Sequence, residues 1–216
     1  MKIGILGTGM VGNTIGSKLI QLGHSVKMGS RTTANEKATS WVKANGTKAS
    51  QGTFADAASF GEIIFNCTAG GVSIGALQTA GKQNLNGKIL IDVANPLDHS
   101  RGSPPGLLSG LSNTTSLGEE IQKTFPGLKV VKTLNTMNCN LMVNASSLKG
   151  EHDVFICGND NEAKTKVKEV LALFGWQSPV DLGDISAARG TEMLLPLWIR
   201  LGSILHTAAF NFKIVK

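Results

Sequence analysis

Aromatic residues and cysteines are scarce in this sequence, and no basic stripe runs along it. Aromatic residues make up 5% of the chain, and its 21 lysines and arginines are scattered. Proteins that bind single-stranded nucleic acid combine a basic groove with aromatic side chains on which bases stack. The formal net charge of +6 would attract anions in general. The pattern nevertheless does not favour a nucleic-acid-binding protein.

The cysteines exclude further classes of site. Cys67, Cys139 and Cys157 form no Cys-x-x-Cys pair and have no histidine at metal-ligand spacing. The sequence therefore predicts neither a metal site nor a disulfide framework, and the thiols are expected to be buried in a reducing compartment. No apolar run reaches the roughly 18 residues that a membrane span requires. The chain also does not open on a secretion signal. We expect a cytoplasmic protein with no membrane partner.

Apolar strands and amphipathic helices alternate along the chain. Strands are expected at residues 2–6, 25–28, 62–67, 88–93, 129–134, 153–157 and 176–182. Helices are expected at residues 10–22, 35–44, 53–60, 72–80, 116–124 and 161–174. A Gly-, Pro- and Ser-rich loop is expected at residues 95–112. Alternation of this kind predicts an α/β fold of the Rossmann type, a doubly wound, mostly parallel sheet. The length suits a single domain, residues 1–216.

A glycine-rich turn between the first strand and the first helix is the most informative motif. It is a G-x-G-x-x-G sequence in a βαβ unit, the context that makes it specific for a dinucleotide. The first glycine permits the tight turn, the second lets a pyrophosphate approach the backbone, and the third lets helix and strand pack closely. The predicted contacts are Gly7, Thr8, Gly9, Met10, Val11 and Gly12.

The end of the second strand favours NADP(H) over NAD(H). An NAD-binding protein carries a carboxylate there to accept hydrogen bonds from the adenosine ribose. This chain has Ser30, Arg31 and Thr32 instead, and its first carboxylate is Glu36. A guanidinium can pair bidentately with a 2′-phosphate, and the hydroxyls can donate to it. Lys37 would add a second positive charge.

Ligands in such sheets bind at the carboxyl ends of the strands. Small or polar residues at three further strand ends are therefore predicted to line the nicotinamide side: Thr68, Ala69, Gly70, Asn95, Asn135, Thr136 and Met137. His99, in the loop after the fourth strand, is the one candidate proton donor. No obligatory acid–base pair is evident, which suits direct hydride transfer between two cofactors, where positioning is the main task.

The C-terminal segment, residues 183–216, is predicted to form one long helix over residues 185–210, kinked at Pro196. Its apolar residues cover most of the helix circumference, as in a helix buried on all sides. We therefore expect a homodimer formed through this helix, or a surface for the second substrate.

Together these residues resemble the NADPH-dependent reductases of the deazaflavin coenzyme F420, and the cytosolic reductase domain of the STEAP metalloreductases is similar. The segments that carry the resemblance are GTGMVG at 7–12, LGHSVKMGSR at 22–31, NTM at 135–137, FICGND at 155–160, ARGTE at 188–192, LWI at 197–199 and FKI at 212–214. The resemblance implies NADP contacts at Thr8, Met10, Val11, Ser30 and Arg31, and a nicotinamide side lined by Thr68, Ala69, Asn135 and Met137.

The second substrate stays open at this point. The resemblance implies hydride transfer between NADPH and F420, but the loop after the third expected strand has no proline, unlike that of F420-using members. The deazaflavin, an ordinary flavin and an unrelated molecule all remain open as the second substrate. An NADP(H)-binding redox sensor without turnover, or a scaffold with a vestigial site, are the alternatives.

Overall fold

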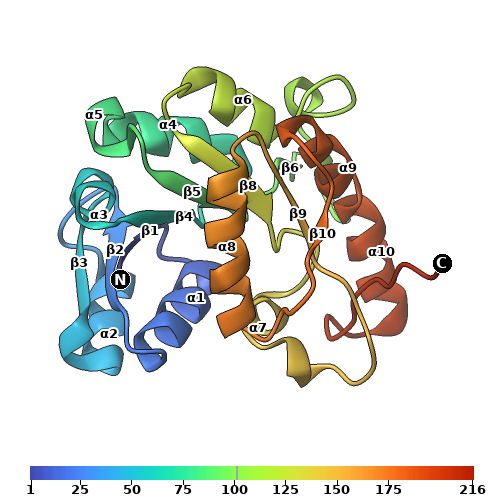
Figure 1. Ribbon diagram of the computed structural model, residues 1–216, viewed down its shortest axis with the longest axis horizontal. Helices are drawn as coiled ribbons and strands as arrows, with labels where there is room; N and C mark the ends of the chain where they lie inside the picture. The colour runs from blue at the N-terminus through green and yellow to red at the C-terminus, as the bar shows by residue number, and fades with distance from the viewer. Residues whose placement is uncertain (101) are drawn as a thin grey trace.

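The protein forms a sheet of eight strands in the order β10-β9-β8-β5-β4-β1-β2-β3 (Figure 1). The computed structural model describes residues 1–100 and 102–216. The strands are β1 Lys2–Leu6, β2 Ser25–Ser30, β3 Ala49–Thr53, β4 Ile63–Asn66, β5 Ile89–Asp92, β8 Lys129–Thr133, β9 Phe155–Gly158 and β10 Val180–Asp181. Neighbouring strands are parallel except for β8 and β9. This arrangement confirms the Rossmann-type α/β fold.

Helices cover both faces of the sheet (Figure 1). One layer consists of α1 Met10–Gln21, α2 Glu36–Asn45, α7 Cys139–Met142 and α8 Asn161–Leu173. The other consists of α3 Phe54–Phe60, α4 Gly70–Ala80, α5 Lys82–Leu85 and α6 Leu117–Thr124. The two-residue period of β1 explains the division, because Ile3 and Ile5 join the first apolar core and Leu6 joins the second. Each of these side chains is fully buried.

Close packing of α3 on the sheet depends on glycine. A Cβ on Gly4 would lie 2.3 Å from the carbonyl oxygen of Ala57, and a Cβ on Gly29 would lie 2.8 Å from the Ala57 methyl. The second strand was expected to end at residue 28, but β2 continues to Ser30, so Gly29 lies inside it. The glycine therefore permits a helix to approach the strand.

The edge strand β3 was not predicted from the sequence. Its residues, ASQGT, show no apolar alternation, and among the described residues it pairs only with β2. The last strand is also shorter than the expected 176–182, since β10 has only two residues. The loop at residues 95–112 contains a short hairpin of β6, Leu97–Asp98, and β7, Gly106–Leu107. Such edge elements are defined by pairing rather than by local sequence.

The C-terminal helical segment is present but shorter than expected, and it is interrupted just before Pro196. A short 3₁₀ turn, η4 Ile185–Ala187, leads into α9, Ala188–Met193, and then into α10, Leu195–Leu205. Pro196 lies in the first turn of α10, where its missing N–H costs least. Helix α10 ends at Leu205, so the expected continuation to residue 210 is wrong.

The chain beyond α10 folds back against the rest of the molecule. The amide of Asp153 donates to the carbonyl of Phe212 at 2.9 Å, and the Asn138 side chain donates to the carbonyl of Ala208. The C-terminal tail is thereby held beside the carboxyl edge of β8. In the part of the chain that the structure describes, no helix is both long and apolar enough to cross a membrane.

Candidate dinucleotide-binding site

An open cleft of about 790 Å³ lies at the carboxyl ends of β1, β2 and β4. The chain leaves β1 towards β2 and β3, then returns to the other side of β1 as β4. A doubly wound sheet binds ligands at such a switch point. The cleft is lined by Gly7, Thr8, Gly9, Arg31, Phe54, Cys67, Thr68, Ala69, Gly71, Val72, Gly75, Ala76 and Thr79.

The glycine turn has the geometry that the motif predicts. Gly7 has a φ of 119°, and a Cβ there would lie 2.6 Å from the carbonyl oxygen of Cys67. A Cβ on Gly12 would lie 2.3 Å from the carbonyl oxygen of Gly7. Around Gly9, by contrast, no heavy atom lies within 4 Å of the Cβ position. The turn is tight on its inner side and open where a phosphate would approach.

The start of α1 is suited to binding an anion. Gly9 caps the helix without any side-chain hydrogen bond, so the first N–H groups have no capping partner. Those groups carry the positive end of the helix dipole. The Met10 side chain is 74% exposed and does not plug the turn. Val11 is half-buried and packs against the core.

Arg31 follows β2 directly, is exposed, and lines the cleft together with the glycine turn. Ser30 is buried and its hydroxyl donates to the carbonyl of Thr32, so it shapes the loop that carries Arg31. Thr32 is exposed and is not one of the residues lining the cleft. Lys37 is on α2 and borders a different groove, with Asn13 and Ser17. Of the predicted phosphate ligands, the structure therefore brings Arg31 alone to the glycine turn.

The nicotinamide-side residues divide into two groups. Thr68 and Ala69 line the open cleft. Gly70 does not form a loop as expected but opens α4, and a Cβ on it would lie 2.3 Å from the Asn95 carbonyl oxygen. Asn95 and Asn135 lie deeper and bind each other reciprocally, since each side-chain amide donates to an oxygen of the other residue, at 2.8 and 2.9 Å. Asn95 and Asn135 thus connect the ends of β5 and β8 below the cleft.

The remaining predicted residues do not reach the cleft. Thr136 and Met137 are 2% and 4% exposed and form part of the buried layer after β8. His99 is exposed in the turn of the β6–β7 hairpin and is not among the lining residues. The structure therefore does not bring an imidazole to the glycine turn.

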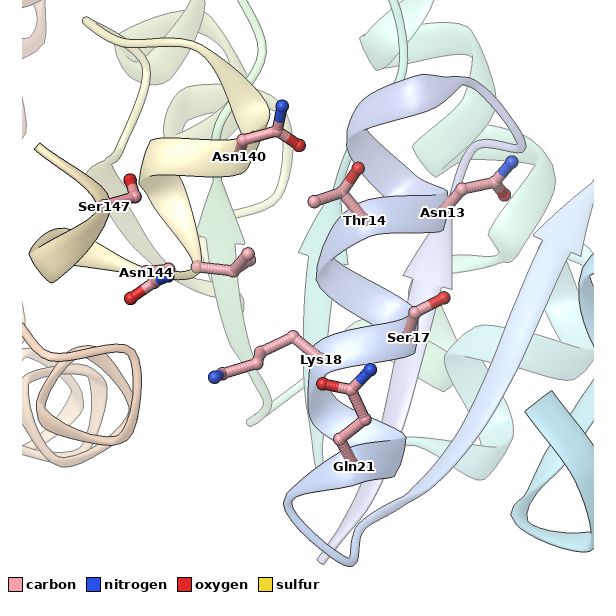
Figure 2. A pocket seen from close by; sticks show the side chains of 9 residues that line it. Asn13, Thr14, Ser17, Lys18, Gln21, Asn140, Asn144 and Ser147 are labelled. Atoms are coloured by element: carbon pink, nitrogen blue, oxygen red, sulfur yellow. The ribbon is translucent and has the colours of Figure 1, made fainter. Parts of the chain in front are cut away.

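A second groove of about 510 Å³ runs between α1 and the segment around α7. Figure 2 shows amide and hydroxyl side chains on both sides, with Lys18 as its only charged lining residue. It contains none of the predicted cofactor contacts. The cleft at the glycine turn remains the candidate site.

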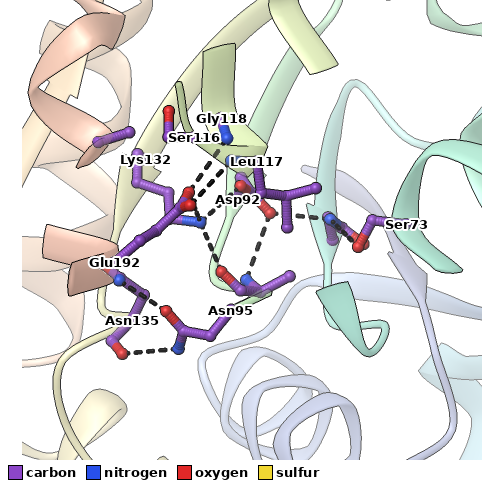
Figure 3. A network of polar contacts seen from close by, with 12 residues as sticks. Ser73, Asp92, Asn95, Ser116, Leu117, Gly118, Lys132, Asn135 and Glu192 are labelled. Carbon is purple, nitrogen blue, oxygen red and sulfur yellow. Dashed lines mark hydrogen bonds and ion pairs between the residues drawn. The ribbon is translucent and has the colours of Figure 1, made fainter. Parts of the chain in front are cut away.

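A buried ionic network that was not predicted from the sequence lies next to the cleft (Figure 3). The Nζ of Lys132 lies 2.8 Å from a carboxylate oxygen of Asp92 and 2.8 Å from one of Glu192. All three side chains are at most 1% exposed. The Glu192 carboxylate also accepts from the amides of Leu117 and Gly118, at 2.8 and 3.1 Å. The network ties β5 and β8 to α9 and to the start of α6.

The charges of this network support one another. Burial by itself lowers the pKa of Lys132, but the carboxylates of Asp92 and Glu192 outweigh burial and raise that pKa above its ordinary value. The α6 N-terminus offsets part of the excess negative charge at Glu192. The signal in the sequence was a charged residue inside each of two otherwise apolar strands, KILIDV and KVVKTL.

The comparisons with known proteins fit this geometry. Residues 2–96 match the family described as coenzyme F420-dependent NADP oxidoreductase. The crystal structure of a candidate F420-dependent NADP reductase from Arthrobacter sp. FB24 is 50% identical, with a TM-score of 0.94 and full coverage of both chains. This chain belongs to the F420-dependent NADP oxidoreductase family. The resemblance found in the sequence is thereby confirmed.

More distant relatives match this chain at lower identity or over only part of their length. Rat metalloreductase STEAP3 is 33% identical over 98% of this chain, which spans 41% of that protein. The F420-dependent NADP reductase of Methanocaldococcus jannaschii is 28% identical over 56% of this chain and 53% of its own length. An imine reductase from Myxococcus stipitatus in complex with NADP⁺ shares the fold, with 20% identity, a TM-score of 0.68 and coverage of 95% of this chain and 63% of that one. The family is one of NADP-dependent oxidoreductases.

Proposed function

We propose that this protein binds NADP(H) in the cleft at the glycine turn and transfers a hydride between it and a flavin-like or deazaflavin acceptor. The proposal rests chiefly on one observation. The N-terminus of α1, which has no side-chain cap, and Arg31 line the same cleft. A helix N-terminus attracts the pyrophosphate, and a guanidinium is suited to a phosphate on the adenosine ribose. The open space around Gly9 supports the fit.

The proposed orientation follows from the order of the strands. The 2′-phosphate would pair with Arg31 beyond β2, and the pyrophosphate would lie over Gly9. The nicotinamide half would then extend past Thr68 towards the ends of β5 and β8. When bound, NADPH supplies the hydride. The chain's part is to hold both ring systems at the proper distance and to exclude water.

The cleft offers no side chain for covalent or acid–base chemistry. Its titratable lining residues are Arg31 and Cys67. Burial raises the pKa of the Cys67 thiol, and the nearby Asp92 charge raises it further, so this thiol stays protonated. Hydride transfer between two cofactors needs neither a nucleophile nor a general base in the protein.

The acceptor is expected beside the C-terminal segment. The carbonyl of Thr191 in α9 accepts from the Asn135 side chain, and the tail is bound to Asn138. Segments after β8 and the C-terminal helices thus meet at the proposed nicotinamide end. Helix α10, which follows α9, carries exposed apolar side chains such as Leu197, at 51%, that would suit an aromatic ring system.

Cofactor binding and turnover can be measured separately. We expect NADPH at about 100 times its dissociation constant to add roughly 2.7 kcal/mol to the free energy of unfolding, and NADH at the same concentration to add much less. A thermal-shift titration tests this. Oxidation of NADPH with a panel of flavins, F420 and quinones then tests transfer. Tight binding without oxidation by any acceptor would instead favour the redox-sensor alternative.

We also propose a homodimer formed through α10. In the single chain, Leu197, Ile204 and Leu205 are 51%, 63% and 52% exposed, so the helix is not buried on all sides as the sequence had suggested. A second copy would cover this apolar surface. Sedimentation equilibrium at micromolar concentration should give twice the chain mass, and Leu197→Glu should shift it to the monomer. A monomeric wild-type protein would refute the dimer.

A further inference from the structure

The hydrogen bonds around Thr68 determine what kind of ligand atom can bind there. Thr68 lines the cleft, and its hydroxyl contacts the side chain of Asn66, which in turn contacts Asp92 of the buried ionic network. Its neighbours Asn66 and Ser73 are fully buried. The position of each proton can be assigned from partners that act only as donors or only as acceptors.

The orientation of the Asn66 side-chain amide is fixed at both ends. Its Nδ2 lies 2.8 Å from Oδ1 of Asp92, whose other oxygen is held by Lys132 at 2.8 Å. A carboxylate bound to a lysine can only accept, so the amide nitrogen must face it. At the other end, Oδ1 of Asn66 lies 3.3 Å from the backbone amide of Thr68, which can only donate. Both neighbours require the same orientation of Asn66.

This orientation also places the Thr68 proton. The Thr68 hydroxyl oxygen lies 2.7 Å from Oδ1 of Asn66, which has no proton to give, so Thr68 must donate to it. The Ser73 hydroxyl accepts from Nδ2 of Asn66 at 3.1 Å. Ser73 can then donate only to the Thr68 oxygen, at 2.8 Å, or to the Ala69 carbonyl, at 3.3 Å. In either case the single proton of Thr68 points inward.

We infer that Thr68 presents only a hydrogen-bond acceptor to the cleft and therefore selects a hydrogen-bond donor on the bound dinucleotide. A phosphate oxygen at neutral pH can only accept, so Thr68 repels one placed against it. The donors of the nicotinamide half are a ribose hydroxyl and the carboxamide N–H group. Thr68 is thus a specificity residue. Asn66 is a positioning residue, because its amide is oriented by the Asp92 carboxylate and in turn orients the Thr68 proton. This inference rests on the proposed function.

The test compares three ligands on matched variants by isothermal titration calorimetry. NADPH carries both candidate donors, its 3-acetylpyridine analogue lacks the carboxamide N–H, and 2′,5′-ADP lacks the whole nicotinamide half. Thr68→Val removes the acceptor with little change in volume, whereas Thr68→Ser retains it. Thr165→Val is the control, because Thr165 is exposed on α8 and its hydroxyl donates to the Asn161 carbonyl.

We expect Thr68→Val to weaken NADPH binding about 10-fold, as loss of one hydrogen bond would. Thr68→Ser and Thr165→Val should stay within about 3-fold of wild type, and 2′,5′-ADP should bind all variants alike. If Thr68→Val does not weaken binding of the 3-acetylpyridine analogue, the carboxamide is the donor. If Thr68→Val weakens binding of the analogue as much as that of NADPH, the ribose hydroxyl is the donor. Asn66→Ala removes the oxygen to which Thr68 donates, so the Thr68 proton is no longer held inward. This variant should therefore also lower the preference for NADPH over 2′,5′-ADP, as Thr68→Val does.

Two results would overturn the assignment. One is unchanged NADPH affinity in Thr68→Val. The other is an equal loss for NADPH and 2′,5′-ADP, which would mean that the substitution acts on the adenosine half or on the fold. Failure of the proposed function looks different, because the wild-type protein would then bind neither ligand and Thr68 would have no dinucleotide to recognise.

Discussion

Lys132→Met should lower the free energy of unfolding by about 3–5 kcal/mol, the usual cost of removing one partner from a buried ionic group. Methionine keeps the approximate length of the side chain but leaves the carboxylates of Asp92 and Glu192 close together without a cation. Neither carboxylate can reach water, since both are at most 1% exposed. Urea denaturation followed by circular dichroism measures the loss.

The pH dependence of this contribution follows from the pKa of Lys132. In the wild-type protein, the raised pKa of Lys132 preserves its contribution through neutral pH, and that contribution is lost only in strongly alkaline solution.

Lys129→Met provides the matched control. Lys129 lies on the same strand but is partly exposed and pairs with Asp160 at 2.8 Å near the surface. Its removal should cost much less, because water can solvate Asp160. A second variant, Lys132→Met combined with Glu192→Gln, should recover part of the lost stability, since only one unpaired carboxylate remains. Equal losses for the two lysines would contradict a buried ionic network.

The sequence predicts local units of this fold well. The strand, glycine turn and helix at residues 2–22 are adjacent in the chain, and the spacing of the turn glycines identifies the unit. Arg31 was found for the same reason, because the end of β2 lies at a fixed distance along a βαβ unit. These features needed no knowledge of distant contacts.

Long-range pairing accounts for what the sequence did not reveal. Residues 92, 132 and 192 meet only after the sheet and α9 have assembled, so the charges in β5 and β8 had no identifiable partner. Asn95 and Asn135 were predicted to face the nicotinamide, but their amides are used to hold strand ends together. The polar strand β3 is likewise defined by its pairing with β2.

Arg31→Glu should weaken NADPH binding about 100-fold or more and leave NADH binding unchanged or improved. The substitution removes a charge-assisted pair with the proposed 2′-phosphate and places a negative charge against it; a 100-fold loss corresponds to about 2.7 kcal/mol. A carboxylate at this position can instead accept hydrogen bonds from the unmodified ribose of NADH. Dissociation constants for both cofactors, measured by calorimetry at one salt concentration, give the ratio directly.

Lys37→Glu is the charge-matched control for this experiment. It makes the same change in net charge, but Lys37 is on α2 and borders the groove shared with Asn13 and Ser17. A general effect of protein charge would weaken NADPH binding to a similar extent in both variants, whereas a specific phosphate contact affects only Arg31→Glu. Because Arg31 is exposed and makes its proposed contact only with ligand, the fold should tolerate its replacement. Unchanged NADPH affinity in Arg31→Glu would therefore exclude this guanidinium as the phosphate ligand.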